Sequence, residues 1–133
     1  MRVMADTNIY ISALLFPTSL PAKALMLIAE KHELVLCDYI VAEIREVVTR
    51  KRPDLLADVD VLLGQLTCDM VIAPNAPSKL IADPKDQPIL NAAIMAEVDV
   101  IISGDKHFLQ LDMERPKVML VADFWRMEGA EEA

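Results

Sequence analysis

The sequence predicts an α/β protein with three layers, in which helices cover both faces of a central, mostly parallel five-stranded sheet. Short apolar runs of strand length alternate along the chain with longer stretches in which apolar residues recur at helical spacing. This alternation is typical of parallel sheets, because parallel strands need crossover connections that are usually helices. The chain has 133 residues, of which 54% are apolar. That size and composition suit one domain with one core.

The strands are expected where four to six residues in a row are mostly apolar, as in strands that helices cover on both faces. The run Glu-Leu-Val-Leu-Cys and the later run Val-Asp-Val-Ile-Ile-Ser show this pattern clearly. The predicted strands span residues 2–5, 33–37, 68–73, 98–103 and 117–121.

Helices are expected between these strands, where apolar residues return every three or four positions. Along one of them Ile40, Ile44 and Val48 share a face, and Glu43 borders it. An acid beside a buried stripe is costly unless it meets a cation or a metal. Residues 1–127 form the predicted domain, and residues 128–133 an acidic, disordered tail. The predicted helices span residues 9–15, 22–31, 40–51, 54–66, 86–96, 106–111 and 123–127.

Capping residues and prolines indicate where several of these helices begin and end. Ser19 or Thr18 can cap the second helix, with Pro21 in its first turn. Asp38 can cap the third helix, which ends before Pro53.

Pro88 decides between two possible starts of the fifth helix. If Asp86 is the N-cap, Pro88 falls at the second helical position, where no intrahelical N–H bond is lost. If Asp83 were the cap, Pro88 would fall at the fifth position and remove a bond. We therefore expect this helix to begin at Asp86.

Charge and composition argue against several classes of protein. The net charge of −8 and the pI of about 4.6 argue against strong non-specific binding of nucleic acid. The basic run from Arg50 to Arg52, with Arg45, either forms a local patch or is a solvated helix end. No secretion signal or membrane span is evident, so a cytoplasmic protein is expected. Cys37 and Cys68 are expected to be free thiols.

Four acids from four separate segments are predicted to share one edge of the sheet. Asp6 follows the first strand and Asp105 the fourth, whereas Asp86 begins a helix and Glu43 lies one turn into another. The carboxyl ends of parallel strands and the helix starts that follow them lie on the same edge. Such a cluster repels itself unless it holds cations. Carboxylate oxygens suit Mg²⁺ or Mn²⁺, and zinc would call for His or Cys.

Each of these acids also has a simpler interpretation. Asp6 and Asp105 are residues that commonly begin turns or cap helices. Glu43 can be an acid on a helix surface, and Asp86 an N-cap, a role compatible with metal binding. It is the placement of all four on one edge that indicates a site.

Four motifs resemble the PIN domain, and most of all the toxin components of bacterial and archaeal toxin–antitoxin pairs. The motifs are Val3-Met-Ala-Asp-Thr-Asn8, Ala42-Glu43, Asp83-Pro-Lys-Asp-Gln-Pro-Ile-Leu90 and Ile101-Ile-Ser-Gly-Asp-Lys-His-Phe108. Their order and spacing carry the resemblance, which runs from Arg2 to about Trp125.

The resemblance implies an endonuclease that cleaves single-stranded RNA with Mg²⁺ or Mn²⁺, by attack of a metal-activated water on the phosphodiester. It implies that the metal ligands are Asp6, Glu43, Asp86 and Asp105. It also implies a homodimer and an antitoxin partner whose segment covers the acidic pocket.

The resemblance assigns a supporting role to four further residues. Thr7 and Asn8 would lie beside Asp6, and Ser103 beside Asp105, as hydrogen-bonding groups that orient the ligands. Thr7 can equally serve only as a cap of the first helix. Asp83 would bind metal through water or replace Asp86 as a ligand. For phosphate contact, Lys106 and the run from Arg50 to Arg52 are the main candidates.

Three other functions compete with the nuclease. A phosphatase would have a second acid two residues after Asp6, where this chain has Asn8. A phosphotransfer receiver domain would have adjacent acids at the end of the first strand and a lysine at the end of the last, and neither is present. A catalytically weak binding module that keeps the fold would fit the low basic charge. Metal-free cleavage by His32 and His107 as general acid and base is the third. Both histidines are expected to face solvent, which argues against it.

Overall fold

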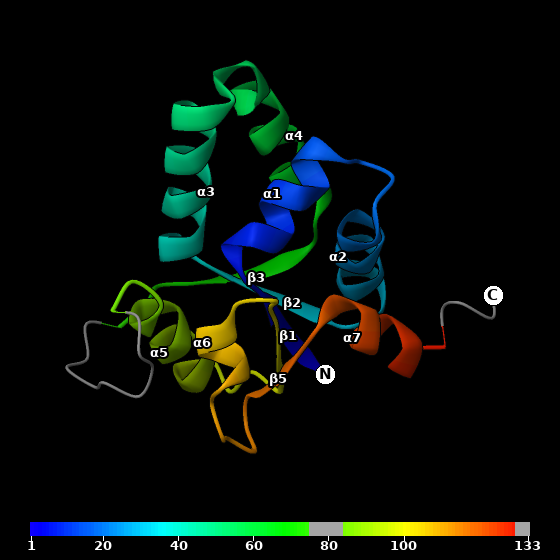
Figure 1. Cartoon of the computed structure of the whole chain (residues 1–133), viewed down its shortest axis with the longest axis vertical. Coiled ribbons are helices and arrows are strands. Elements are labelled where there is room, and N and C mark those ends of the chain that lie inside the picture. Colours follow the sequence, from blue (N-terminus) through cyan, green and yellow to red (C-terminus); the bar gives the residue numbers. More distant parts are fainter. Residues whose placement is uncertain (75–83, 130–133) are drawn as a thin grey trace.

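The structure is a computed structural model that describes residues 1–74 and 84–129 (Figure 1). In this part of the chain, five strands form one sheet in the order β3-β2-β1-β4-β5, and all neighbouring strands are parallel. The α/β fold with a parallel five-stranded sheet is therefore confirmed. The strands are β1 (Arg2–Ala5), β2 (Glu33–Cys37), β3 (Cys68–Val71), β4 (Val100–Ile102) and β5 (Lys117–Met119). The helices are α1 (Thr7–Leu15), α2 (Leu20–Lys31), α3 (Asp38–Lys51), η1 (Pro53–Leu55), α4 (Leu56–Gln65), α5 (Gln87–Met95), α6 (Lys106–Leu109) and α7 (Val121–Met127).

The helices form two layers because the chain reverses its direction across the sheet. From β1 it steps to β2 and β3, and then returns past β1 to β4 and β5. Right-handed crossovers place the connecting helices of the two directions on opposite faces. In Figure 1, α1, α3 and α4 accordingly lie above the sheet, and α5 and α6 below it. The first strand β1 is therefore central, and the strand order reverses beside it, which is where parallel sheets bind ligands.

The core is built from the apolar runs that the sequence indicated as strands. Every residue of β4 and the last three residues of β1 are buried, as are the last four of β2. Large side chains from both helical layers cover them, among them Leu25, Ile44 and Leu90, each at most 1% exposed. This double coverage explains why these strands read as continuous apolar runs, without the alternation of a sheet that has one solvated face.

The helices α1 and α2 each begin two residues earlier than predicted, directly after their N-cap residues. Asp6 is the N-cap of α1, and its Oδ1 accepts a hydrogen bond of 3.2 Å from the N–H of Ile9. Ser19 caps α2, as expected, and its hydroxyl accepts from the N–H of Ala22 at 3.4 Å.

The prediction that Asp38 caps α3 is wrong. The N-cap position belongs to Cys37, which makes no side-chain capping bond, and Asp38 is the first residue of the helix. The carboxylate of Asp38 instead accepts a 2.8 Å hydrogen bond from the N–H of Ala73, just beyond β3. Asp38 thereby joins the start of α3 to the neighbouring strand end, a long-range partner that local sequence does not reveal.

His32 is more enclosed than predicted. Its Nε2 lies 2.8 Å from Oε1 of Glu128, and its ring packs edge to face against Phe124 of α7. Its Nδ1 lies 3.2 Å from the amino group of Met1. Glu128, which the sequence placed in the acidic tail, is therefore anchored to the domain. The rest of that predicted tail, from residue 130 onward, lies outside the described residues.

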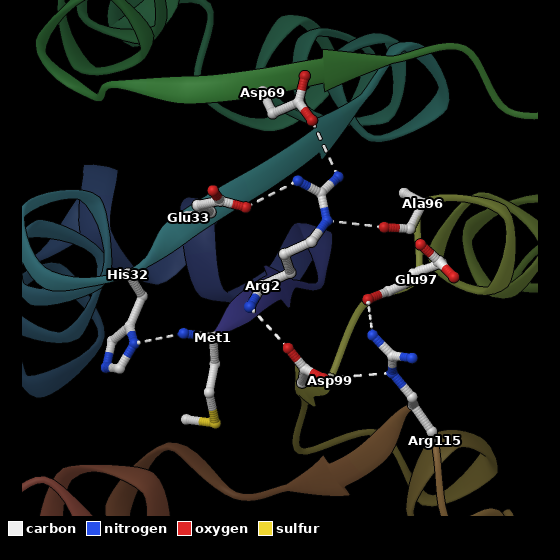
Figure 2. A network of polar contacts seen from close by, with 9 residues as sticks. All are labelled: Met1, Arg2, His32, Glu33, Asp69, Ala96, Glu97, Asp99 and Arg115. Carbon is white, nitrogen blue, oxygen red and sulfur yellow. Dashed lines mark hydrogen bonds and ion pairs between the residues drawn. The ribbon is translucent and has the colours of Figure 1, made fainter.

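Arg2 connects three strands and a helix at the amino-terminal end of the sheet (Figure 2). Its guanidinium bonds to Glu33 of β2 and Asp69 of β3, both at 2.9 Å, and its Nε donates to the carbonyl of Ala96 at 2.7 Å. Its backbone N–H donates to Asp99, which also pairs with Arg115 at 3.2 Å. The two carboxylates raise the pKa of Arg2, so it stays charged.

We expect replacement of Arg2 by Met to lower the free energy of unfolding by about 1–2 kcal/mol, because a carbonyl and two carboxylates lose one shared donor. Urea denaturation monitored by circular dichroism measures the change. The matched control is Arg45→Met, which removes a single exposed pair with Asp60 and should cost less than about 0.5 kcal/mol. Equal losses in the two variants would contradict a special role of Arg2.

Two further expectations from composition concern thiols and membranes. Cys37 is buried, Cys68 is half-buried, and neither forms a disulfide. Within residues 1–74 and 84–129, no single helix is long and apolar enough to cross a membrane, and α1 and α2 pass that test only as a pair bent by 116°.

Candidate active site

Asp6 lies at the carboxyl end of the central strand, directly beside the end of β4. Its backbone N–H donates to the carbonyl of Ile102 at 3.0 Å, so the two strand ends are held together. Its side chain is only 4% exposed, and the hydroxyl of Ser103 donates a short hydrogen bond to Oδ2. Ile9 supplies the bond to the other oxygen. Both carboxylate oxygens are thus oriented from within the fold.

A cavity of about 200 Å³ opens at this edge and brings all four predicted acids together. Asp6 comes from the end of β1, Glu43 from α3, Asp86 from the start of α5 and Asp105 from the loop after β4. Their meeting follows from the topology, since each segment lies at the carboxyl end of the sheet. The described lining residues are Asp6, Thr7, Asn8, Glu43, Val47, Lys85, Asp86, Ile89 and Asp105.

Glu43 is half-buried and is oriented by Thr7. The Thr7 hydroxyl donates a short hydrogen bond to Oε1 of Glu43, which joins the first turn of α1 to α3. Thr7 is buried and is the first helical residue, whereas the cap of α1 is Asp6. Of the two roles considered for Thr7, the structure shows the bond to an acid of the cavity. The neighbouring Asn8 is exposed and lines the same cavity.

Asp86 stands at the N-cap position of α5, and Pro88 is in the first turn, as predicted. The side chain of Asp86 makes no capping hydrogen bond with the helix and lines the acidic cavity. The predicted capping bond is therefore absent, and the residue contributes its carboxylate to the cavity. Asp83, the alternative acid, lies outside the described residues.

Asp105 is the N-cap of α6 and is held from two sides. Its N–H donates to the hydroxyl of Ser103 at 3.0 Å, and its Oδ1 accepts from the N–H of His107 at 2.7 Å. Ser103 is fully buried and contacts both Asp6 and Asp105, so it links the two acids that follow neighbouring strands.

His107 lies next to two of the candidate site's acids, a position that the sequence reasoning missed. The prediction that it faces solvent is wrong, because it is partly buried and its Nδ1 lies 3.4 Å from Oδ1 of Asp105. One donor atom each from Asp86, Asp105 and His107 lies within 4.8 Å of the others. The sequence signal that could have indicated this is its position two residues after Asp105.

Burial and mutual repulsion make the acidic cavity costly without a cation. Burial raises the pKa of Asp6, and the nearby charge of Asp105 raises it further, whereas the bonds from Ser103 and Ile9 lower it. Among the described lining residues, only Lys85 is a cation. Hard divalent cations prefer carboxylate oxygens as ligands, so the residues present fit Mg²⁺ or Mn²⁺.

The basic residues considered for phosphate contact lie in different places. Arg50 lines a second cavity next to the acidic one. Arg52 is paired with Asp54 through two bonds of 3.0 and 2.8 Å on the exposed end of α3. Lys106 is exposed and is not among the described residues that line either cavity.

A larger cleft of about 500 Å³ lies elsewhere, among α1, α2, α4 and α7. Its lining includes Met26, Leu27, Leu62 and Trp125 and is mainly apolar. The titratable groups suited to catalysis gather in the smaller cavity at the sheet edge, which is therefore the candidate active site.

Comparison with known proteins agrees with this fold. The chain is 31% identical over 120 residues to an uncharacterized protein of Methanocaldococcus jannaschii, MJ1680, with 84% of this chain and 75% of that protein covered. Its fold is similar to that of a chain in the crystal structure of VapBC2 from Rickettsia felis bound to a DNA fragment from their promoter, with a TM-score of 0.69 at 16% identity. That match covers 90% of this chain and 98% of the other. Residues 2–107, which include all four acids and His107, match the family described as PIN domain, and the chain therefore belongs to the PIN domain family.

Proposed function

We propose that this protein is a divalent-metal-dependent endoribonuclease that cleaves single-stranded RNA and is the toxin of a toxin–antitoxin pair. The observation that carries the proposal is the convergence of Asp6, Glu43, Asp86 and Asp105 on one cavity at the carboxyl end of the sheet. Membership of the PIN domain family supports a nuclease, and the fold shared with a chain of the VapBC2 structure supports a toxin–antitoxin role.

The four carboxylates would hold the metal. When bound, Mg²⁺ or Mn²⁺ lowers the pKa of coordinated water and stabilises charge that develops on the phosphodiester oxygens. The chain's own contribution is orientation. Ser103 holds Asp6 and Thr7 holds Glu43 through short hydrogen bonds, so two ligands from different segments meet in fixed positions.

The competing mechanism with two histidines finds no support in the geometry. His32 precedes β2 and lies beside Met1, at the amino-terminal end of the sheet, whereas His107 lies beside Asp105 at the carboxyl end. General acid and base must both reach one reacting group, which these two residues cannot do from opposite ends of the sheet. Cys37 is fully buried, and burial raises the pKa of its thiol, so it is not suited to act as a nucleophile.

Two alternatives remain distinguishable by experiment. A phosphatase of the kind considered would need a second acid at the position of Asn8, which instead presents an amide to the cavity. A weak binding module would keep the fold but gain little from metal, whereas the proposed nuclease should be stabilised by Mn²⁺ by several degrees. The homodimer, the antitoxin partner and the cytoplasmic location belong to the proposal.

The test is cleavage of a labelled single-stranded RNA by the purified protein in Mn²⁺, in Mg²⁺ and in EDTA. We expect cleavage only with metal, and none of a double-stranded RNA of the same sequence. Equal cleavage in EDTA would overturn the metal mechanism. A folded protein that binds Mn²⁺ but cleaves none of several unrelated RNAs would favour the binding module.

His107 is expected to bias the site toward Mn²⁺. An imidazole nitrogen is a better ligand for Mn²⁺ than for Mg²⁺, which prefers oxygen. We therefore expect His107→Asn to weaken Mn²⁺ binding about tenfold, in the range found when groups around a metal are removed. Binding of Mg²⁺ should change far less. Isothermal titration with each metal measures this, and the ¹⁴N coupling of bound Mn²⁺ in electron spin echo spectra should vanish in the variant. A ¹⁴N signal unchanged by the substitution would rule out His107 as a ligand.

A further inference from the structure

A second cavity of about 330 Å³ adjoins the acidic one along α3. The two cavities share Glu43, Val47 and Lys85 as lining residues. The second is bounded further by Tyr39 and Arg50. Tyr39, Glu43 and Arg50 are spaced by four and seven residues, so they lie on one side of α3. The second cavity therefore follows the same side of α3 from Tyr39 to Arg50, a rise of roughly 16 Å along the helix.

The second cavity has a different chemistry from the first. Its charged lining residues are two cations, Arg50 and Lys85, and two acids, Glu43 and Glu46, and it also presents the aromatic ring of Tyr39. Proteins that bind single-stranded nucleic acid commonly combine aromatic rings with cations, because bases stack on the rings and phosphates pair with the cations. Tyr39 is half-buried against the core, so its ring is held in place.

Among the arginines in the part of the chain that the structure describes, Arg50 has the longest ion pair with a carboxylate. Its pair with Glu46 spans 3.5 Å between two side chains that are 61% and 70% exposed. Each of the other arginines has a carboxylate partner within 3.2 Å, as Arg45 has in Asp60 and Arg52 in Asp54. A long, exposed pair contributes little to stability, so a phosphate can replace Glu46 at little cost.

We propose that this second cavity is the binding subsite for the nucleotides next to the cleaved bond, with Tyr39 stacking on a base and Arg50 pairing with a phosphate. The inference rests on the proposed RNA cleavage, because it assigns the path of that substrate. It also indicates how an acidic protein can bind RNA, because two cations balance the two acids of the second cavity, whereas the acidic cavity has four carboxylates and one lysine among its described lining residues. Glu46 competes with the phosphate for Arg50, so it limits affinity.

The test is binding of a fluorescein-labelled single-stranded RNA octanucleotide, followed by anisotropy at low ionic strength. All variants carry Asp6→Asn in addition, so that the RNA is not cleaved. Arg50→Gln should weaken binding about fivefold to tenfold and reduce the slope of log K against log salt by about 0.7, the value for one phosphate contact on a single strand. Glu46→Gln should strengthen binding a few-fold, because the competing carboxylate is gone.

Three matched variants separate these effects from loss of charge and loss of folding. Arg52→Gln removes the same charge two residues further along the chain, outside the cavity, and should leave affinity nearly unchanged. Tyr39→Leu should weaken binding at least fivefold, whereas Tyr39→Phe keeps the ring and should bind as before. Circular dichroism verifies that each variant is folded.

The kinetic readout, with Asp6 intact, is the KM for the octanucleotide, which Arg50→Gln should raise several-fold and Arg52→Gln should leave nearly unchanged. Equal effects of Arg50→Gln and Arg52→Gln would overturn the subsite. So would a polyglutamate peptide that binds as tightly as the RNA with the same response to the variants, because the site would then select acidic peptides. If the protein cleaves no RNA but the binding pattern holds, the proposed nuclease fails and the subsite stands.

Discussion

Replacing Asp6 by Asn is expected to abolish metal-dependent RNA cleavage while the protein stays folded. Asn keeps the size of the side chain, an oxygen that can accept from the N–H of Ile9, and an amide N–H that can donate to the Ser103 hydroxyl oxygen, but it removes the charge that would hold the cation. A divalent metal supplies several kcal/mol of transition-state stabilisation, so the rate should fall at least about a thousandfold. Single-turnover cleavage of a labelled RNA measures it.

The same substitution should raise stability when no metal is present. Burial raises the pKa of Asp6, so the folded state holds its proton more tightly than the unfolded chain does. The penalty for the charged form is absent below the carboxyl's ordinary pKa of about 4, develops as pH rises through the folded-state pKa, and stays at neutral pH. The Asn variant avoids this penalty, so its advantage in EDTA should be largest near pH 7 and vanish toward pH 4.

In excess Mn²⁺ the wild type should become more stable than the Asp6→Asn variant. A cation that binds only the folded wild type stabilises it in proportion to the logarithm of the cation concentration. The control is Asp112→Asn, which makes the same chemical change on an exposed loop residue and should show neither effect. Wild-type turnover in the Asp6→Asn protein, or equal stabilisation of both proteins by Mn²⁺, would show that the metal site lies elsewhere.

The elements of this fold were predictable because local and tertiary preferences agree. The run Glu33–Cys37 reads as a buried strand and is one, and Ser19 and Pro21 mark the start of α2. The site acids were predictable as a group for a different reason. A parallel sheet brings strand ends and helix starts to one edge, so sequence position alone places Asp6 and Asp105 on the same edge.

Interactions between remote segments were not predictable from the residues alone. Asp38 has the sequence context of a helix cap, yet it bonds to the N–H of Ala73. His32 follows a helix end that reads as a solvated turn, but α7 packs over it with Phe124 and Glu128. In each case the partner lies 35 or more residues away, so the outcome depends on how the elements pack, which local propensity does not contain.

The same limit applies to the groups that orient the acids. The resemblance placed Ser103 beside Asp105, but its bond to Asp6 depends on the register between β1 and β4, which pairs Ala5 with Ile102. The orientation of His107 cannot be derived from the sequence, because α6 has only four residues and its direction depends on how it packs. The positions of Ser103 and His107, which follow β4, depend on how the strands pair and how α6 packs, and neither can be derived from the residues alone.

Removing the Ser103 hydroxyl should weaken metal binding without removing a ligand. Ser103 is fully buried, donates to Asp6 and accepts from the N–H of Asp105, so Ser103→Ala loosens both acids at once. Loss of such an orienting group typically lowers metal affinity or activity about 10–100-fold. Titration with Mn²⁺ should show a higher dissociation constant, and Ser12→Ala, on the neighbouring helix, should leave it unchanged.

The pH dependence distinguishes this electrostatic role from simple packing. The bond from Ser103 lowers the pKa of Asp6 against the effect of burial, so its loss raises that pKa further. Protons then compete with the metal up to a higher pH, and the acidic limb of the pH–rate profile should move to higher pH. Much of the lost activity should return at alkaline pH or at high Mn²⁺. A uniform loss at every pH, with no movement of the acidic limb, would mean that Ser103 only fills space between the two strand ends.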